Sequence, residues 1–263
     1  MDEEPTILLT NDDGVDSPGF RALYDALSDL GRVVGVAPSN DQSAVGRSLS
    51  NEVTVADHEL GYAVDGTPAD CVIAALESLV PETDLVVSGC NKGANLGSYV
   101  LGRSGTVSAA VEAAFFGVPA IAVSQYIPVA KDVSFHQYET TLEDYVEAAR
   151  ATAYLAEHAP AAGVFEECDF LNVNVPAPEG EVGGMEITRP SHVYDMGARH
   201  EAGTVKLVDN VWERMASGDV PDPEGTDRRA VVEGRISVSP LTAPHATERH
   251  DALDALAETY PEP

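Results

Sequence analysis

Positive charge, cysteine and long apolar runs are all scarce in this chain. Among 263 residues there are 15 basic and 44 acidic side chains, so the formal net charge at pH 7 is −29, and only three basic residues are lysines. A nucleic-acid polymer is disfavoured as a partner, because no basic stripe can replace its counterions. The acidic residues are spread along the whole chain, which indicates adaptation to high salt, where the Debye length falls to about 3 Å at 1 M.

The three cysteines, Cys71, Cys90 and Cys168, have no C-x-x-C spacing. We expect them to be small buried residues in a reducing compartment, and neither a disulfide framework nor a zinc site. No apolar run is long enough to cross a bilayer, and the acidic start Met1–Glu4 lacks the basic region of a secretory signal. We therefore expect a cytoplasmic protein that does not contact a membrane.

Short apolar runs alternate with helical patterns up to about residue 176. Strands are predicted at 7–10, 32–37, 84–88, 119–124 and 170–175, and helices at 18–30, 68–79, 105–116 and 139–158. Ser17-Pro18 and Thr67-Pro68 each place an N-cap residue before a proline at the first helical position. This alternation predicts the α/β class, with a parallel sheet covered by helices on both faces.

Beyond residue 176 glycine and proline become frequent. Strands are predicted at 185–189, 203–208 and 235–241, a loop at 217–229 and an amphipathic helix at 247–259. We interpret 177–263 as a β-rich extension with a helical arm, following a core at 1–176.

Two adjacent carboxylates, Asp12 and Asp13, directly follow the first predicted strand. Ligands gather at the carboxyl ends of parallel strands, and holding both carboxylates ionised requires a cation. A hard divalent ion with oxygen ligands is the natural counter-charge. On these residues alone, a simple turn with Gly14 before the helix capped by Ser17 is an equally good interpretation.

Two polar loops follow later strands. In the first, Ser43 offers a hydroxyl as a metal ligand and Arg47 a guanidinium for phosphate, although a plain solvated loop explains its composition better. The second contains three glycines together with Asn91 and Asn95. Glycines let the backbone approach a ligand, and asparagines supply neutral oxygen and amide groups.

The helix start at Ser104–Ser108 is suited to an anion. Its free backbone N–H groups, helix dipole and hydroxyls favour phosphate, while ordinary capping by Ser104 explains the same residues without a ligand. All four segments lie at a strand end or a helix start, so one crevice can hold them. Together they supply the metal ligands and the hydrogen-bond donors to phosphate that metal-assisted phosphoryl transfer requires.

Motifs of competing chemistries are missing. The sequence has no GxxxxGK[ST] loop, no GxSxG elbow and no GxGxxG turn after the first strand, and its seven histidines have no metal-type spacing, which disfavours zinc. A receiver-like signalling module would need an aspartate where strand 84–88 leads to Asn91. A haloacid-dehalogenase-type phosphatase would need the spacing D-x-D, whereas Asp12 and Asp13 are adjacent.

The ordered motifs closely resemble the SurE family of survival-protein nucleotidases. The matching segments are Thr10–Gly14 with Ser17-Pro18-Gly19, Ala37-Pro38 with Ser43, Gly66–Cys71, Ser88–Asn95, Ser104–Ser108, Asn172–Pro176, Thr188-Arg189, Thr226-Asp227 and Ser237–Leu241. The resemblance implies a Rossmann-like three-layer core, and an extension at 177–263 with an oligomerisation hairpin and an arm exchanged between subunits of a homodimer or homotetramer. It also implies hydrolysis of nucleoside 5′- or 3′-monophosphates, and some members cleave short polyphosphate.

Carried over by position, the resemblance implies one divalent metal ion per subunit, Mg²⁺ or Mn²⁺, held by Asp12, Asp13, Ser43 and Asn91. The phosphate would meet Asn95, Ser104, Gly105 and Thr106. Our hypothesis is that Asp12 or Asp13 orients the attacking water or accepts its proton, while the phosphate-binding residues stabilise charge on the phosphoryl oxygens. Arg103 and the run 218–224 depart from the family pattern.

Overall fold

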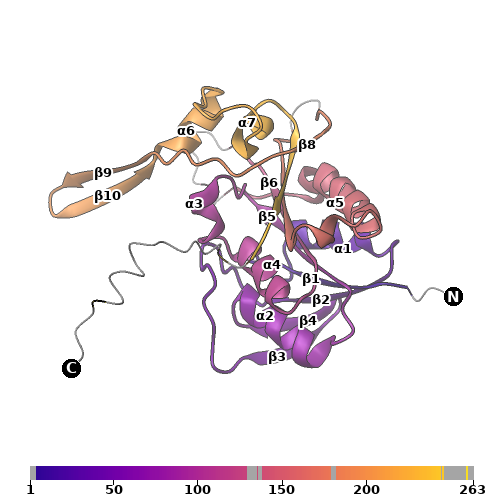
Figure 1. The fold of residues 1–263 in the computed structure, drawn as a ribbon. Helices are drawn as coiled ribbons and strands as arrows, with labels where there is room; N and C mark the ends of the chain where they lie inside the picture. Colours follow the sequence, from indigo (N-terminus) through magenta and orange to yellow (C-terminus); the bar gives the residue numbers. More distant parts are fainter. Residues whose placement is uncertain are drawn as a thin grey trace.

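The computed structural model describes residues 4–128, 135, 138–178, 182–243, 245 and 259. Its centre is a nine-stranded sheet (Figure 1), which in spatial order contains β3 (Thr54–His58), β4 (Gly61–Asp65), β2 (Arg32–Pro38), β1 (Thr6–Thr10), β5 (Leu85–Lys92), β6 (Ala120–Gln125), β7 (Phe170–Val175), β11 (Ile236–Leu241) and β8 (Met185–Ile187). Neighbours from β4 to β7 are parallel. β3 and β11 run antiparallel to β4 and β7. The predicted α/β class with a parallel sheet is confirmed.

Helices cover both faces of this sheet (Figure 1). α1 (Pro18–Leu27) and α5 (Val146–His158) pack on one face, and α2 (Pro68–Ala74) and α4 (Gly105–Phe115) pack on the other. Successive side chains of a strand point to opposite faces, so Leu9 of β1 joins the cluster under α1 while Leu8 joins the one under α2 and α4. These clusters separate three layers, as the resemblance implies.

The helix starts form as their sequences predict. Ser17 caps α1 by accepting a hydrogen bond from the backbone N–H of Phe20, and Thr67 and Asp70 form a reciprocal capping box at α2. α2 continues as a π-helical turn, η1 (Ala75–Leu79). Each cap fixes a helix directly after a loop at the carboxyl edge of the sheet.

The structure differs from the predicted elements in several places. The stretch between the predicted elements at 32–37 and 68–79 contains the β3–β4 hairpin. β9 (Met196–Glu201) pairs with β10 (Thr204–Asp209), of which only the second was expected. The predicted loop at 217–229 is helical at both ends. Its first residue is the last of α6 (Asn210–Ser217), and its last residues begin α7 (Asp227–Val232). Asp209 and Thr226 occupy the N-cap positions of these two helices. The predicted helix at 247–259 lies outside the described residues, apart from Thr259.

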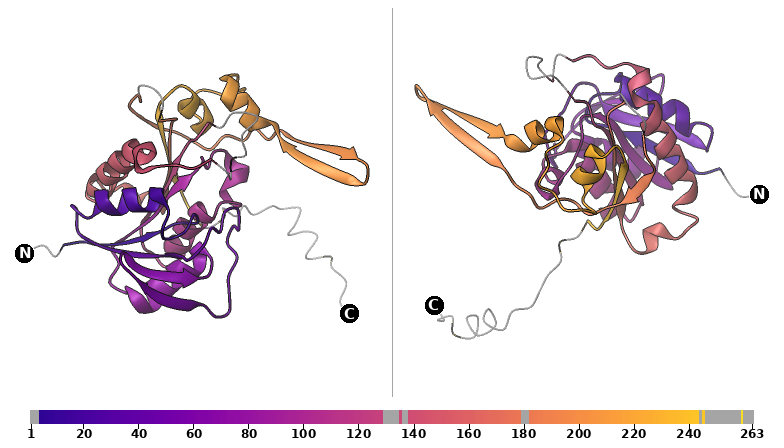
Figure 2. Two further views of the ribbon diagram at one scale, coloured as in Figure 1. Left: turned by 180° about the vertical axis from the view of Figure 1, so that it is seen from behind. Right: turned by 90° about the horizontal axis from the view of Figure 1, so that it is seen from above.

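The chain beyond residue 176 returns to the sheet. β11 lies between β7 and β8, so the segments 1–176 and 177–263 share one sheet. The β9–β10 hairpin projects from the body of the molecule (Figures 1 and 2). In the described part of the chain, every helix is too short or too polar to cross a membrane.

Candidate functional site

The turn after β1 is made by Asn11, and not by the acidic pair. The Asn11 amide nitrogen donates to the Gly14 carbonyl and to Ser17 Oγ, each at 2.8 Å, and its side-chain oxygen accepts from the Gly14 N–H. Gly14 has a φ of 101°, which favours glycine. Because Asn11 satisfies this turn, the carboxylates of Asp12 and Asp13 are left to make other contacts.

Asp12 is only 3% exposed and lies against the start of α4. Its Oδ1 accepts a hydrogen bond of 2.6 Å from the Thr106 hydroxyl, and the Thr106 backbone N–H bonds the same carboxylate. A Cβ at Gly105 would lie 2.8 Å from the Asp12 Cβ, so glycine is what allows this approach. Burial raises the pKa of Asp12, and the hydrogen bonds from Thr106 oppose that shift.

Asp13 lies against the end of β5. Its Oδ2 accepts a hydrogen bond of 2.7 Å from the Lys92 backbone N–H. Burial, followed by repulsion from Asp12, raises the pKa of Asp13 to about 7. A bound cation would therefore strongly stabilise the ionised form of these two buried carboxylates.

The donor set suits a hard divalent ion. Among the described residues, neither carboxylate forms an ion pair with a basic side chain. The same residues contain no group of three or more histidine, cysteine, aspartate or glutamate side chains that could hold a metal ion. Neutral oxygens such as those of Ser43 and Asn91, which line the same cavity as Asp12, are further candidate ligands. An oxygen-only set is what Mg²⁺ and Mn²⁺ prefer.

A cavity of about 590 Å³ brings together five of the eight predicted site residues: Asp12, Ser43, Asn91, Asn95 and Ser104. Asp13 borders a second hollow of about 500 Å³, and Lys92 borders both. Gly105 and Thr106 do not line either hollow. Thr106 was predicted at the phosphate, but both of its donors are directed at Asp12.

Asn91 and Asn95 are held by the central strands. Asn91 lies near the end of β5, where the register with β6 shifts after Ser88, and its amide donates to the Gly93 carbonyl. The Asn95 amide nitrogen donates to Ser124 Oγ at 2.8 Å, and its backbone N–H donates to Asn174 Oδ1 at 2.7 Å. The side-chain amide of Asn95 has two N–H groups, and the hydrogen bond to Ser124 uses one of them.

Ser43 is placed by a residue that the sequence did not single out. Its N–H and hydroxyl both donate to Asp41 Oδ1, at 2.7 and 2.6 Å, and the neighbouring Gln42 N–H donates to the Asp12 carbonyl. The order Asp41-Gln42-Ser43 is the local signal that could have revealed this turn. Arg47 does not reach the cavity, because it pairs with Glu112 at 2.9 Å.

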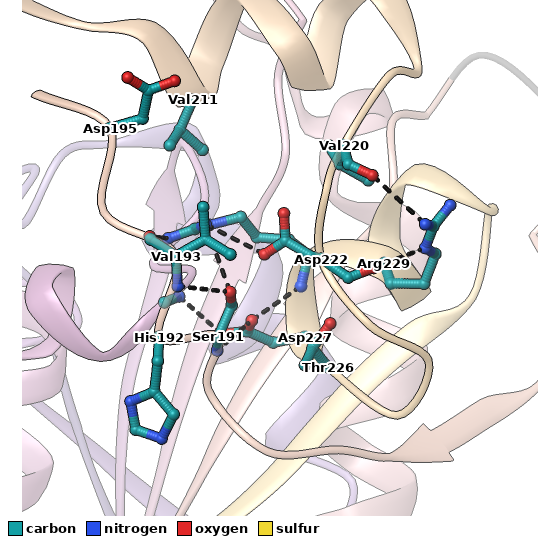
Figure 3. Close-up of polar contacts among 12 residues, drawn as sticks. Ser191, His192, Val193, Asp195, Val211, Val220, Asp222, Thr226, Asp227 and Arg229 are labelled. Atoms are coloured by element: carbon teal, nitrogen blue, oxygen red, sulfur yellow. Dashed lines mark hydrogen bonds and ion pairs between the residues drawn. The ribbon is translucent and has the colours of Figure 1, made fainter.

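A buried polar cluster anchors the loop between Asn95 and Ser104. Asp227 accepts hydrogen bonds from the backbone N–H groups of Gly97 at 2.6 Å and Ser191 at 2.9 Å. Figure 3 shows Asp227 beside Ser191 in this cluster. The fully buried Arg228 pairs with Asp222 at 3.0 Å and donates to the Val193 carbonyl. Asp222, Asp227 and Arg228 come from the segment 217–229 that was predicted as a loop, and the Thr226-Asp227 motif was the one local signal of this cluster.

Comparisons with known proteins give matches over most of the chain. The model of the family described as survival protein SurE matches residues 7–195. The chain is 66% identical over 258 residues to the 5′-nucleotidase SurE of Haloarcula marismortui, which covers 98% of this chain and 96% of that protein. It is 60% identical over 261 residues to the 5′-nucleotidase SurE of Haloquadratum walsbyi, with coverages of 99% and 98%.

The crystal structure of the SurE protein from Aquifex aeolicus is also similar, with a TM-score of 0.75, 32% identity, and coverage of 97% of this chain and 98% of that one. The two archaeal relatives are halophiles, in agreement with the salt adaptation predicted from the acidic composition. From the order of its motifs, its sheet and these likenesses, the chain belongs to the SurE family.

Proposed function

We propose that this protein is a metal-dependent nucleotidase that hydrolyses nucleoside 5′-monophosphates to nucleoside and phosphate. The observation that carries the proposal is the buried pair Asp12 and Asp13, whose charge has no basic partner among the described residues, beside a cavity that also reaches the start of α4. The names of the archaeal relatives support the substrate class.

Asp12, Asp13, Ser43 and Asn91 would hold one divalent cation, Mg²⁺ or Mn²⁺, in each subunit. When bound, such an ion supplies positive charge to phosphoryl oxygens and makes a nearby water more acidic. The oxygen-only donor set supports this assignment.

The chain's own residues would do the rest. Asp12 lines the cavity and is fixed by Thr106, so we assign it the orientation of the attacking water. The second N–H of the Asn95 amide and the N-terminal end of α4 at Ser104 and Gly105 would stabilise negative charge on the phosphoryl oxygens. Asp13, which the Lys92 backbone N–H holds in place, would add a second negative charge to the metal site.

Phosphate release from the four 5′-monophosphates, the 3′-isomers and tripolyphosphate tests the proposal, in molar KCl with Mg²⁺, Mn²⁺ or a chelator. We expect release from the 5′-monophosphates that stops in chelator and returns with metal. The Asp12→Asn variant should be inactive at every metal concentration, whereas Asp65→Asn, which removes an exposed carboxylate on β4, should match the wild type. Full activity of Asp12→Asn in saturating metal would exclude the assignment, and a trapped phospho-aspartate would favour the dehalogenase-type alternative.

We also propose a cytoplasmic homodimer or homotetramer that uses the β9–β10 hairpin. The hairpin exposes Leu207 at 75% and Val205 at 54%, and these two side chains lie on the same face of β10 because they are two positions apart. Light scattering in molar KCl tests this. Leu207→Asp should lower the mass per particle, and an unchanged mass would exclude this surface.

A further inference from the structure

Helix α6 presents two different faces. Val211 and Met215 are buried in a small apolar cluster with Leu96. The next residue after each, Trp212 and Ala216, lines the cavity that contains Asp12. Since residues four apart share a helix face, the burial of one pair directs the other pair toward the cavity.

Four polar contacts fix α6 in this orientation. Asp209 caps the helix through the Val211 N–H and accepts from the hydroxyl of Tyr99, on α3 (Ser98–Leu101), at 2.6 Å. Asp195 accepts from the side chains of Asn210 at 3.0 Å and Arg214 at 3.1 Å. Figure 3 shows Asp195 and Val211 on adjoining segments above the buried cluster. These contacts hold α6, and with it the backbone that carries the Trp212 indole, in place before any ligand binds.

The polar and the aromatic groups of the cavity lining come from different elements. The polar groups lie in the loops or strand ends after β1, β2 and β5 and at the start of α4, whereas the aromatic side chains Tyr126, Phe135 and Trp212 come from the segment after β6 and from α6. A ligand that fills both linings needs an anionic end and a flat apolar end. A cavity of about 590 Å³ is within the usual size range for small-molecule sites, roughly 300–1,000 Å³.

We propose that Trp212 is the stacking surface of a nucleobase subsite. The inference rests on the proposed function and names what that function leaves open, namely the residue that contacts the base. Aromatic side chains stack on the face of any base, and the larger face of a purine gains more from an indole than a pyrimidine does. The subsite therefore favours purine nucleotides.

The chain contains one tryptophan, so its fluorescence reports on this subsite without any need for catalysis. In chelator, which prevents turnover, we expect AMP and adenosine to quench the emission and ribose 5-phosphate to leave it unchanged. No quenching by AMP in a protein that hydrolyses AMP with metal would overturn the inference and leave the proposed function standing. Quenching by AMP in a protein that releases no phosphate with any metal would support the base subsite and overturn the proposed function.

Kinetics give a second readout. Trp212→Ala should lower kcat/KM for AMP about tenfold relative to kcat/KM for ribose 5-phosphate, mainly through KM, and Trp212→Phe should restore most of the ratio. Tyr154→Ala removes an exposed aromatic from α5, away from the cavity, and should leave the ratio unchanged. Equal losses for both substrates in Trp212→Ala would mean that the indole only supports the fold, and would overturn the inference.

Discussion

The hydroxyl of Thr106 donates to Oδ1 of Asp12 across 2.6 Å, and both side chains are buried. This contact joins the first turn of α4 to the second residue after β1. It stabilises the ionised form of a carboxylate whose burial favours the neutral form. Thr106 therefore acts on the site through Asp12.

Thr106→Val tests this contact with little change in volume. Without the hydroxyl donor the pKa of Asp12 should rise further, and kcat/KM at neutral pH should fall about 10- to 100-fold, which corresponds to the roughly 1.5–3 kcal/mol of a hydrogen bond to a charged group. Raising the pH should recover part of the loss. Thr152→Val is the matched control, because Thr152 is equally buried but its hydroxyl donates to the Ala148 carbonyl in α5. Identical pH profiles for Thr106→Val and the wild type would contradict this role.

Gly105→Ala should reduce activity while the fold is retained. The added Cβ would lie 2.8 Å from the Asp12 Cβ and 2.9 Å from its Oδ2, so the carboxylate must move. We expect at least about a tenfold loss of kcat/KM, since small displacements of catalytic groups are costly. Gly102→Ala provides the control, because an added Cβ there meets nothing within 4 Å. Circular dichroism verifies folding, and equal activities of the two variants would count against the geometry.

The metal-free protein should lose stability as the pH rises toward neutrality. The pKa of Asp13 is raised from 3.8 to about 7. A carboxyl with a raised folded-state pKa stabilises the native state fully below its unfolded pKa, and the contribution disappears as the pH passes through the folded pKa.

Urea unfolding of the wild type and Asp13→Asn in molar KCl with chelator measures this effect. Between about pH 5 and about pH 7, the free energy of unfolding of the wild type should fall by roughly 2–3 kcal/mol relative to the variant. Saturating Mg²⁺ should stabilise the wild type at the upper end of the range and the variant much less. A difference that does not change with pH would show that the carboxyl titrates normally.

Arg228 and Asp222 form an ion pair in which both side chains are fully buried. Arg228→Met leaves the carboxylate without its partner and should lower the free energy of unfolding by about 3–5 kcal/mol. The double variant Asp222→Leu with Arg228→Met removes both charges and should recover most of that loss. Arg150→Met, which breaks an exposed pair with Glu147, should change the unfolding curve little. A double variant that is no more stable than Arg228→Met would contradict the explanation.

The parts of the structure that could be predicted have local signals. Asp12 and Asp13 follow a short apolar run, and the caps Ser17 and Thr67 precede prolines, so a few adjacent residues suffice to place them. The sheet class follows from the same kind of alternation.

The parts that were missed depend on distant partners. β3 has an almost fully exposed burial pattern and becomes a strand only by pairing with β4. α6 is short and charged, and its Val211 and Met215 are buried against Leu96, far away in the chain. The contact between Thr106 and Asp12 was missed for a similar reason, since the acceptor lies 94 residues earlier in the chain and no local pattern distinguishes a carboxylate from a phosphate as the acceptor.

The position of β11 has a consequence for biosynthesis. A ribosome makes every other strand of the nine-stranded sheet before it reaches Ile236, yet β11 lies inside the sheet between β7 and β8. Until it is released, the nascent chain carries an open edge on β7 and a strand β8 without its neighbour. The strand of the sheet that is translated last therefore closes it, and a chain cut short before Ile236 would expose an edge able to capture other chains.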